Sequence, residues 1–235
     1  MRYFLVISMV VYASLAAGQE QIVQTNTQGK GEQYTLTFKP GESFYYPLVA
    51  VWVEDSEGNY LQTLYVPKSI AKGTFTFGKI EDNEYKPGPK RLPAALPYWG
   101  HKRGVRAEDG LYLPSPKNPV PDAYSGASPT RAFVLHTRAD KPLPLGATIL
   151  VEVNQSWDWN QYWNNGKFPE SEAYKASAQP ALIYRVAVED VHDKPVTMEL
   201  IGHSHYAGQN GNLFEDLSTF TTALQIFEQI TIRRE

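Results

Sequence analysis

The sequence predicts an all-β protein: an antiparallel immunoglobulin-like β-sandwich with a long proline-rich inserted loop. Three observations favour this fold class. Segments of alternating or β-branched residues recur along the chain, aromatic residues make up 13% of it, and apolar residues at helical spacing are rare. Many short strands with few helical periods are typical of two packed sheets.

The first eighteen residues are predicted to be a signal peptide. They combine Arg2, an apolar run and small residues at Ala16 and Gly18, which is the usual order of such a peptide. The apolar run is shorter than the ~20 residues that cross a bilayer. We therefore expect residues 19–235 to form one exported domain, periplasmic or extracellular, without a transmembrane segment.

The strands follow in order after the signal peptide. "QYTLTF" (33–38) alternates apolar and polar residues, the period of a half-buried strand. "PLVAVWVED" (47–55) and "YLQTLYVP" (60–67) are rich in β-branched and aromatic residues and are joined by a short turn, so they predict a hairpin. Further strands are predicted at 131–137, 147–155, 181–190 and 195–206, and a last one near 229–235.

Two segments depart from this pattern. Residues 79–130 hold nine of the 17 prolines and little periodicity, so we interpret them as the inserted loop, with a helical turn within 91–100. Residues 216–227 carry apolar side chains at helical spacing. This second segment forms either a helix or a loop that leads into the last strand.

Composition excludes several classes of function. The chain has no cysteine, which removes disulfides, thiolate catalysis, iron–sulfur clusters and thioether-attached haem. Its net charge of −3 gives no basic surface for nucleic acid. Phosphate-binding glycine loops and the His-Glu-x-x-His zinc motif are also absent from the sequence.

The most informative short segment is "PDAYSGASPT" (121–130). Its serines first suggest a nucleophile, but a hydrolase elbow requires Gly-x-Ser-x-Gly between a strand and a helix. Here Pro129 stands where the helix would begin. Serine hydrolysis is therefore not expected.

Two histidines, His203 and His205, suggest a metal site. Side chains two residues apart on a strand point to the same face, so both imidazoles are able to share one ion. Sequence spacing identifies no third ligand, and exposed polar alternation at a strand end explains the pair equally simply.

The segment "NQSWDWNQYWNNGKF" (154–168) places Trp157, Trp159 and Trp163 among short amides. Ring faces stack on planar ligands while amides orient them, so the segment suggests a sugar-binding or flavin-stacking surface. The alternative is an aromatic loop packed against the core.

Three segments carry a resemblance to a known family. "AVWVEDSEGNYLQTLYV" (50–66), "RLPAALPYWG" (91–100) and "DAYSGAS" (122–128) occur in this order. Over roughly residues 20–130 the chain resembles the predicted periplasmic proteins grouped as domain-of-unknown-function family 2271. The tryptophan–aspartate–glycine loop that many of these proteins carry is replaced here, which indicates a divergent member. The resemblance implies an exported sandwich.

"DAYSGAS" is also similar to the acceptor sequence Asp-x-x-(Ser/Thr)-Gly-Ala-(Thr/Ser) of proteins that receive FMN from ApbE-type flavin transferases. This resemblance implies that Ser128 bears the flavin phosphate, with Asp122, Ser125, Gly126 and Ala127 forming the rest of what we call the acceptor motif. Such an acceptor is expected on a protruding, flexible turn. An ordinary tight turn also favours Asp, Ser and Gly.

Two functions are therefore predicted. The first is a covalent FMN carrier in extracytoplasmic electron transfer, which needs a flavin transferase and a membrane electron-transfer partner and is not an enzyme on its own. Trp99, Trp157 and Trp159 are the candidates to stack on its ring. The alternative is a non-catalytic module that binds a carbohydrate, peptide or partner protein through Trp157, Trp159 and Trp163.

Overall fold

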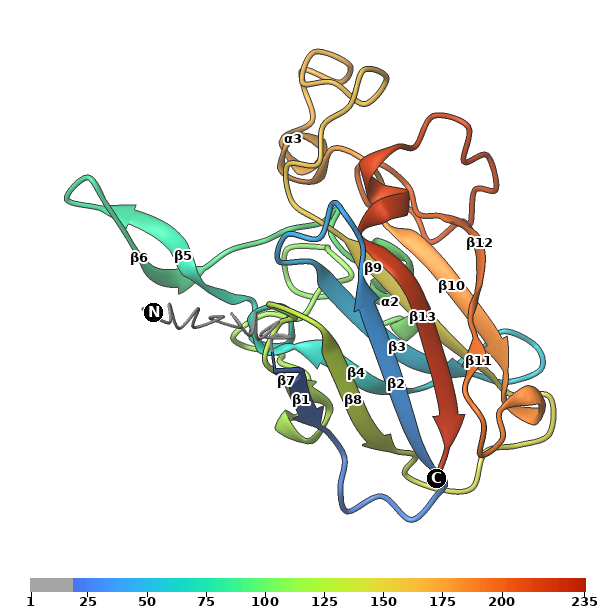
Figure 1. Cartoon of the computed structure of the whole chain (residues 1–235). Helices are drawn as coiled ribbons and strands as arrows, with labels where there is room; N and C mark the ends of the chain where they lie inside the picture. The colour runs from blue at the N-terminus through green and yellow to red at the C-terminus, as the bar shows by residue number, and fades with distance from the viewer. Residues whose placement is uncertain (1–18) are drawn as a thin grey trace, which may run out of the picture.

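Two β-sheets face each other and form a sandwich (Figure 1). The computed structural model describes residues 19–235, so the predicted signal peptide at 1–18 lies outside the described residues. The first sheet has the order β1 (Gln21–Gln24), β8 (Phe133–Arg138), β2 (Gln33–Pro40), β13 (Phe227–Arg234) and β11 (Val196–Thr197). The second has the order β12 (Glu199–His203), β10 (Leu182–Ala187), β9 (Thr148–Asn154), β3 (Leu48–Glu54), β4 (Tyr60–Pro67) and β7 (Ser125–Gly126). The predicted all-β sandwich is confirmed.

Most neighbouring strands pair antiparallel, as predicted. The exceptions are two edge pairs, β1 with β8 and β4 with β7, which run parallel. Both involve a very short strand that arrives from a distant part of the chain, so no hairpin constrains its direction. The immunoglobulin-like strand arrangement stays a prediction.

The main core lies between the two sheets. In β2 the alternating residues Tyr34, Leu36 and Phe38 are fully buried, and the Phe38 ring contacts the Phe133 ring of β8 with centroids 5.2 Å apart. The period-two pattern of residues 33–38 therefore predicted this strand and its inward face correctly.

Strand β3 is buried on both faces. Val49, Val51 and Val53 belong to the main core, whereas the alternate residues, Trp52 among them, belong to a second hydrophobic core. Since neighbouring side chains of a strand point to opposite faces, a further layer must cover the outer face of the six-stranded sheet.

That layer comes from residues 79–130, the segment that was predicted to be an inserted loop, together with a short helix that precedes it. It includes α1 (Lys68–Lys72), α2 (Pro97–Arg103) and the 3₁₀ turn η1 (Asp122–Tyr124). Leu96 and Trp99 are completely buried against the sheet. The interpretation of residues 79–130 as an irregular loop is thus wrong in part, because its apolar residues cover a sheet face that is too hydrophobic to meet water.

Glu152 of β9 attaches α2 to the sheet. The backbone N–H of Tyr98 donates to its Oε1 at 3.0 Å and that of Trp99 to its Oε2 at 2.7 Å. These N–H groups lie in the first turn of α2, where a helix has no internal acceptors. At the other end of α2, Lys102 donates to Glu54 Oε2 at 3.1 Å.

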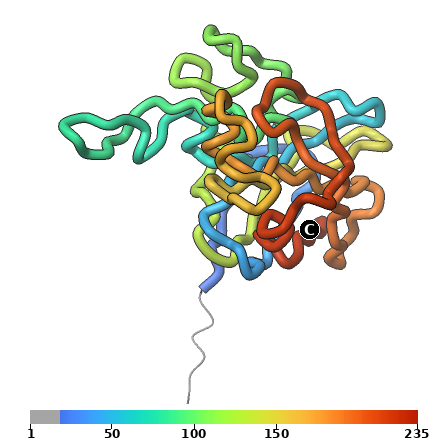
Figure 2. Tube along the Cα trace, turned by 90° about the horizontal axis from the view of Figure 1, so that it is seen from above, coloured from blue at the N-terminus to red at the C-terminus, as the bar shows by residue number. Residues whose placement is uncertain are grey.

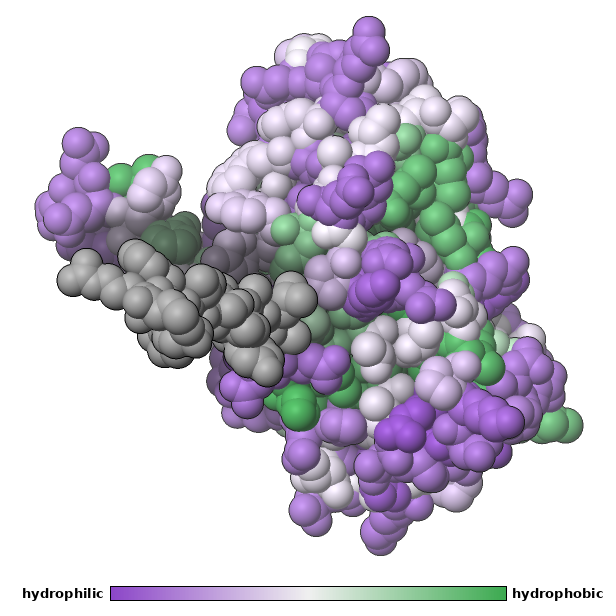
Figure 3. All heavy atoms as spheres, viewed as in Figure 1, coloured by the Kyte–Doolittle hydropathy of each residue, from purple (hydrophilic) through white to green (hydrophobic). Residues whose placement is uncertain are grey.

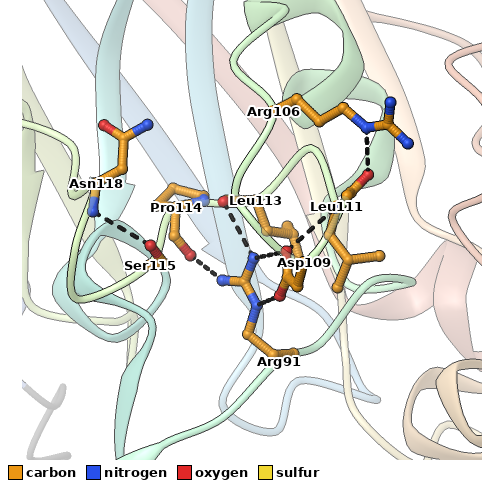
Figure 4. A network of polar contacts seen from close by, with 9 residues as sticks. Arg91, Arg106, Asp109, Leu111, Leu113, Pro114, Ser115 and Asn118 are labelled. Carbon is orange, nitrogen blue, oxygen red and sulfur yellow. Dashed lines mark hydrogen bonds and ion pairs between the residues drawn. The ribbon is translucent and has the colours of Figure 1, made fainter.

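One arginine orders the turns that follow α2 (Figure 4). The Arg91 guanidinium donates from Nε to Asp109 Oδ2 at 2.7 Å and from Nη2 to Asp109 Oδ1 at 3.1 Å. It also donates to the carbonyls of Leu113 and Pro114. A planar fork of donors can thus hold a proline-rich loop that has few backbone donors of its own.

An arm projects from the body of the protein, formed by β5 (Thr74–Glu81) and β6 (Glu84–Pro89). Figures 1 and 2 show it extending away in both views. It pairs with no third strand within residues 19–235 and exposes Phe77, Ile80 and Tyr85, each at least 65% accessible. Figure 3 shows hydrophobic atoms on this arm.

The remaining elements are short. They are α3 (Glu172–Ser177) and the 3₁₀ turns η2 (Val188–Asp190) and η3 (Thr222–Gln225). Within residues 216–227 only η3 is helical, so the loop alternative describes most of that segment. In the part of the chain that the structure describes, no helix has the length and apolar character required to span a membrane.

Replacing Glu152 tests the attachment of α2. In Glu152→Gln the side-chain NH₂ group cannot accept a hydrogen bond, so the N–H of Tyr98 or Trp99 loses its partner. We expect a loss of about 1–3 kcal/mol in the free energy of unfolding, measured by urea denaturation. Glu189→Gln, at an exposed position, is the control and should change little.

The same carboxyl predicts a pH dependence. Burial raises the pKa of Glu152 from 4.5 to about 8, although the two backbone N–H groups oppose this shift. The native carboxyl therefore binds a proton that the unfolded chain releases, so its contribution to stability falls as pH rises from 4.5 to about 8. Urea denaturation across this range should give a steeper decline for the wild type than for Glu152→Gln, and equal slopes would contradict the assignment.

Candidate functional site

The acceptor motif lies at one edge of the six-stranded sheet. Asp122 begins η1, and Ser125 and Gly126 form β7. Val66 and Pro67 at the end of β4 pair with these two residues in parallel register. The motif is therefore an edge strand with a turn on either side.

Accessibility divides the motif into two parts. Asp122 and Ala127 are exposed and Ser128 is half-buried, but Ser125 and Gly126 are buried. The expectation of a protruding turn is wrong for the central residues, because β4 recruits them into the sheet.

Gly126 has a packing role. A Cβ at this position would lie 2.5 Å from Val23 Cγ1, closer than real Cβ contacts allow, and 3.1 Å from Tyr65 Cε2, which is a tight contact. Gly126 is not among the glycines with positive φ. The glycine is required here because β1 and β4 approach the backbone closely, which no sequence pattern predicts.

The main chain around Ser128 is held on both sides. Tyr65 donates its hydroxyl to the Ala127 carbonyl at 2.6 Å. Gln21 donates from Nε2 to the Ser128 carbonyl at 3.0 Å and accepts the Thr130 N–H at 2.9 Å. None of the hydrogen bonds within residues 19–235 uses the Ser128 hydroxyl.

Asp122 does not cap the turn. Its carboxylate forms an ion pair with Lys72 of α1, with Nζ and Oδ1 3.0 Å apart, and η1 has no side-chain cap. Within residues 19–235 no backbone N–H of the turn donates to this carboxylate. The carboxylate is 74% accessible, so a second protein can reach it.

The four candidate tryptophans differ in environment. Trp99 is fully buried and Trp163 nearly so, while Trp159 is half-buried and packs edge-on against Tyr174. Only Trp157 is widely exposed, at 65%. Trp99 cannot stack on a ligand because it fills the second core under α2, and its indole N–H donates to Thr63 Oγ1.

Trp163 is also remote from Ser128. Its ring lies 6.5 Å from that of His203 at the end of β12, and β12 and β7 are the two edges of the same sheet. At ~4.8 Å per strand, five spacings separate these edges by about 24 Å. Trp163 therefore does not cover a group attached to Ser128.

The two histidines have different hydrogen-bond roles. His203 Nδ1 bonds to the Ser204 carbonyl at 2.8 Å and so carries a proton. His205 Nδ1 accepts from the backbone N–H of Ala207 at 3.1 Å. Burial lowers the pKa of both rings. Within residues 19–235 no group of three or more His, Cys, Asp or Glu side chains is placed to hold a metal, so the predicted metal site lacks a third ligand.

Both histidines instead line a hollow that we call the aromatic hollow. It consists of two adjoining depressions that share Trp163, His203 and Phe214. Phe214 and the amides of Asn210 and Asn212 did not enter the sequence predictions. The available signal was the run "GQNGN" (208–212), which is typical of a loop and begins three residues after His205.

Replacing Gly126 tests the packing at the motif. Gly126→Ala should lower the free energy of unfolding by about 1–3 kcal/mol, because Val23 and Tyr65 must move. Urea denaturation measures the loss. Gly166→Ala is the matched control, since its Cβ meets nothing closer than 3.4 Å; equal effects of the two substitutions would contradict the packing role.

Comparisons with known proteins assign no relative. Neither a protein-family model nor a curated protein matches the chain, and the resemblance to family 2271 stays a prediction.

Proposed function

We propose that this protein is an exported carrier of FMN, joined as a phosphoester to Ser128, that takes part in extracytoplasmic electron transfer. The observation that carries the proposal is the state of Ser128. Its backbone carbonyl is held by Gln21, while the hydroxyl of this partly exposed residue has no hydrogen-bond partner within residues 19–235. A hydroxyl in this state is available for reaction, and its modification breaks no hydrogen bond within the protein.

The surroundings of Ser128 support recognition by a flavin transferase. Asp122 and Ala127 are exposed on either side of the buried pair Ser125 and Gly126. A transferase would contact the exposed residues, while β7 fixes the spacing between them. The ion pair with Lys72 balances the charge of Asp122, so this carboxylate repels an incoming phosphate less than an unpaired one would.

The attachment step balances with FAD as donor. The Ser128 Oγ forms a bond to the phosphorus on the flavin side of the diphosphate, the bond from that phosphorus to the AMP oxygen breaks, and AMP leaves. The hydroxyl proton passes to a base of the transferase. No oxidant or reductant is needed.

Two of the candidate tryptophans do not cover a flavin ring attached at Ser128. Trp99 is buried and Trp163 lies across the sheet, so neither shields the ring. Bound flavin would supply the redox chemistry, and its ring would lie at the surface, accessible to a membrane electron-transfer partner. This arrangement suits a carrier better than an enzyme.

Intact-mass measurement tests the attachment. The chain is produced with its signal peptide together with an ApbE-type transferase, and we expect one FMN per protein with acid-stable yellow fluorescence. Ser128→Ala should abolish the adduct, and Ser128→Thr should retain it because it keeps the hydroxyl. Thr130→Ala, which removes the next exposed hydroxyl, is the control and should also retain it.

Two outcomes reject the proposal. One is a wild-type chain that carries no FMN under these conditions. The other is an adduct that persists in Ser128→Ala.

A further inference from the structure

The aromatic hollow is built from loops at one end of the sandwich. Its parts come from the loop after β9, from the segment that follows β12, and from the approach to η3. In Figure 1 these loops lie together around α3 and beyond β12. Each of the two adjoining depressions has a volume of about 490 Å³, within the usual range for ligand sites.

The hollow has a fixed aromatic wall. His203 and Phe214 exchange two backbone hydrogen bonds of 2.7 and 2.9 Å, and their rings stack with centroids 5.4 Å apart. The Trp163 indole N–H donates to Thr219 Oγ1 at 3.1 Å. Phe214 remains 37% exposed, so part of this wall meets the solvent without rearrangement of the loops.

Polar groups border this wall. His205 Nδ1 accepts backbone N–H groups, so the proton of its neutral ring is on Nε2, which is a donor. Burial, together with the charges of His101 and His203, lowers the pKa of His205 and favours the neutral ring. Asn210 and the exposed Asn212 add amide groups that both donate and accept.

Charge at the hollow disfavours an anionic ligand. Glu215 and Asp216 line one of the two depressions, whereas the cation at its border, Lys167, lies over the Trp163 ring with Nζ 5.3 Å from the centroid. A phosphate or a nucleotide would meet two carboxylates there. The suitable ligand is neutral, has an apolar face for the rings and carries hydroxyl groups for the amides.

We propose that the aromatic hollow binds a neutral carbohydrate chain. A pyranose ring has an apolar face that packs on an aromatic ring, and adjacent hydroxyls that pair with amide and imidazole groups. The two depressions share one wall, so neighbouring sugar units occupy them in succession. The site is independent of flavin attachment, because it lies about 24 Å across the sheet from β7 at ~4.8 Å per strand.

Fluorine NMR of 5-fluorotryptophan protein tests the site. The chain has five tryptophans, and Trp163→Phe assigns the reporter in the hollow. The Ser128→Ala protein is titrated to millimolar concentration with maltohexaose, cellohexaose and chitohexaose, so the result does not depend on FMN. We expect at least one sugar to shift the Trp163 resonance while those of Trp52 and Trp99, in the second core, stay unchanged.

Variants localise the binding. Phe214→Ala and Asn212→Ala should each weaken the response, the first by about tenfold or more because an aromatic contact is lost. Asn212 is exposed, so its substitution does not threaten folding. Trp157→Ala is the matched control, since Trp157 is exposed but lines neither depression, and it should bind as the wild type does.

Three results overturn the proposal. The first is the absence of any shift with all three hexasaccharides. The second is a shift that both Phe214→Ala and Asn212→Ala leave unchanged. The third is an equal response of the Trp163 resonance to free FMN, which would show that the hollow does not select neutral ligands.

Discussion

The six-stranded sheet is buried on both faces, and the rest of the structure follows from this constraint. Val51 of β3 faces the main core and its neighbour Trp52 faces the second, so the chain needs a third layer as well as two sheets. Glu152 fixes the position of α2 within that layer, because its carboxyl accepts hydrogen bonds from the free N–H groups at the start of the helix. Hydrophobic burial alone would hold α2 against the sheet without fixing its position.

The third layer also places the acceptor motif. From α2 the chain passes through turns that Arg91 holds and reaches η1, which directly precedes β7. The position of Ser128 at the sheet edge therefore depends on packing that is remote in sequence. Its two direct supports, Tyr65 and Gln21, come from other strands as well.

The local sequence pattern predicted the strands of the sandwich. It failed for segments whose structure depends on contacts with residues that are distant in the chain. Residues 33–38 and 60–67 have the period or composition of strands, and both are strands. The apolar run of β3 is typical of a strand that is buried on both faces, but its cover comes from short helices and turns that have no period to detect. The β5–β6 hairpin was missed although Asp82 and Asn83, both with positive φ, form a turn pair that such hairpins favour.

The candidate site illustrates the same limit. Sequence identified the acceptor motif as a unit but could not show that Gly126 packs against Val23 and Tyr65, because residues 23 and 126 are far apart in the chain. It grouped Trp99 with Trp157, although one is buried and the other is exposed. Residue type indicates what a side chain is able to do, whereas accessibility depends on contacts between distant segments.

The two proposed sites lie at opposite edges of one sheet, and this separation has a functional consequence. Under the two proposals, a ligand in the aromatic hollow would leave the β7 edge free, so the protein would be held on a carbohydrate matrix while a flavin on Ser128 met its partner. Because no loop among residues 19–235 contributes to both sites, binding at one has no direct contact there through which to alter the other. Tethering and electron transfer would then combine by proximity, through the higher local concentration of the carrier, and would require no conformational change.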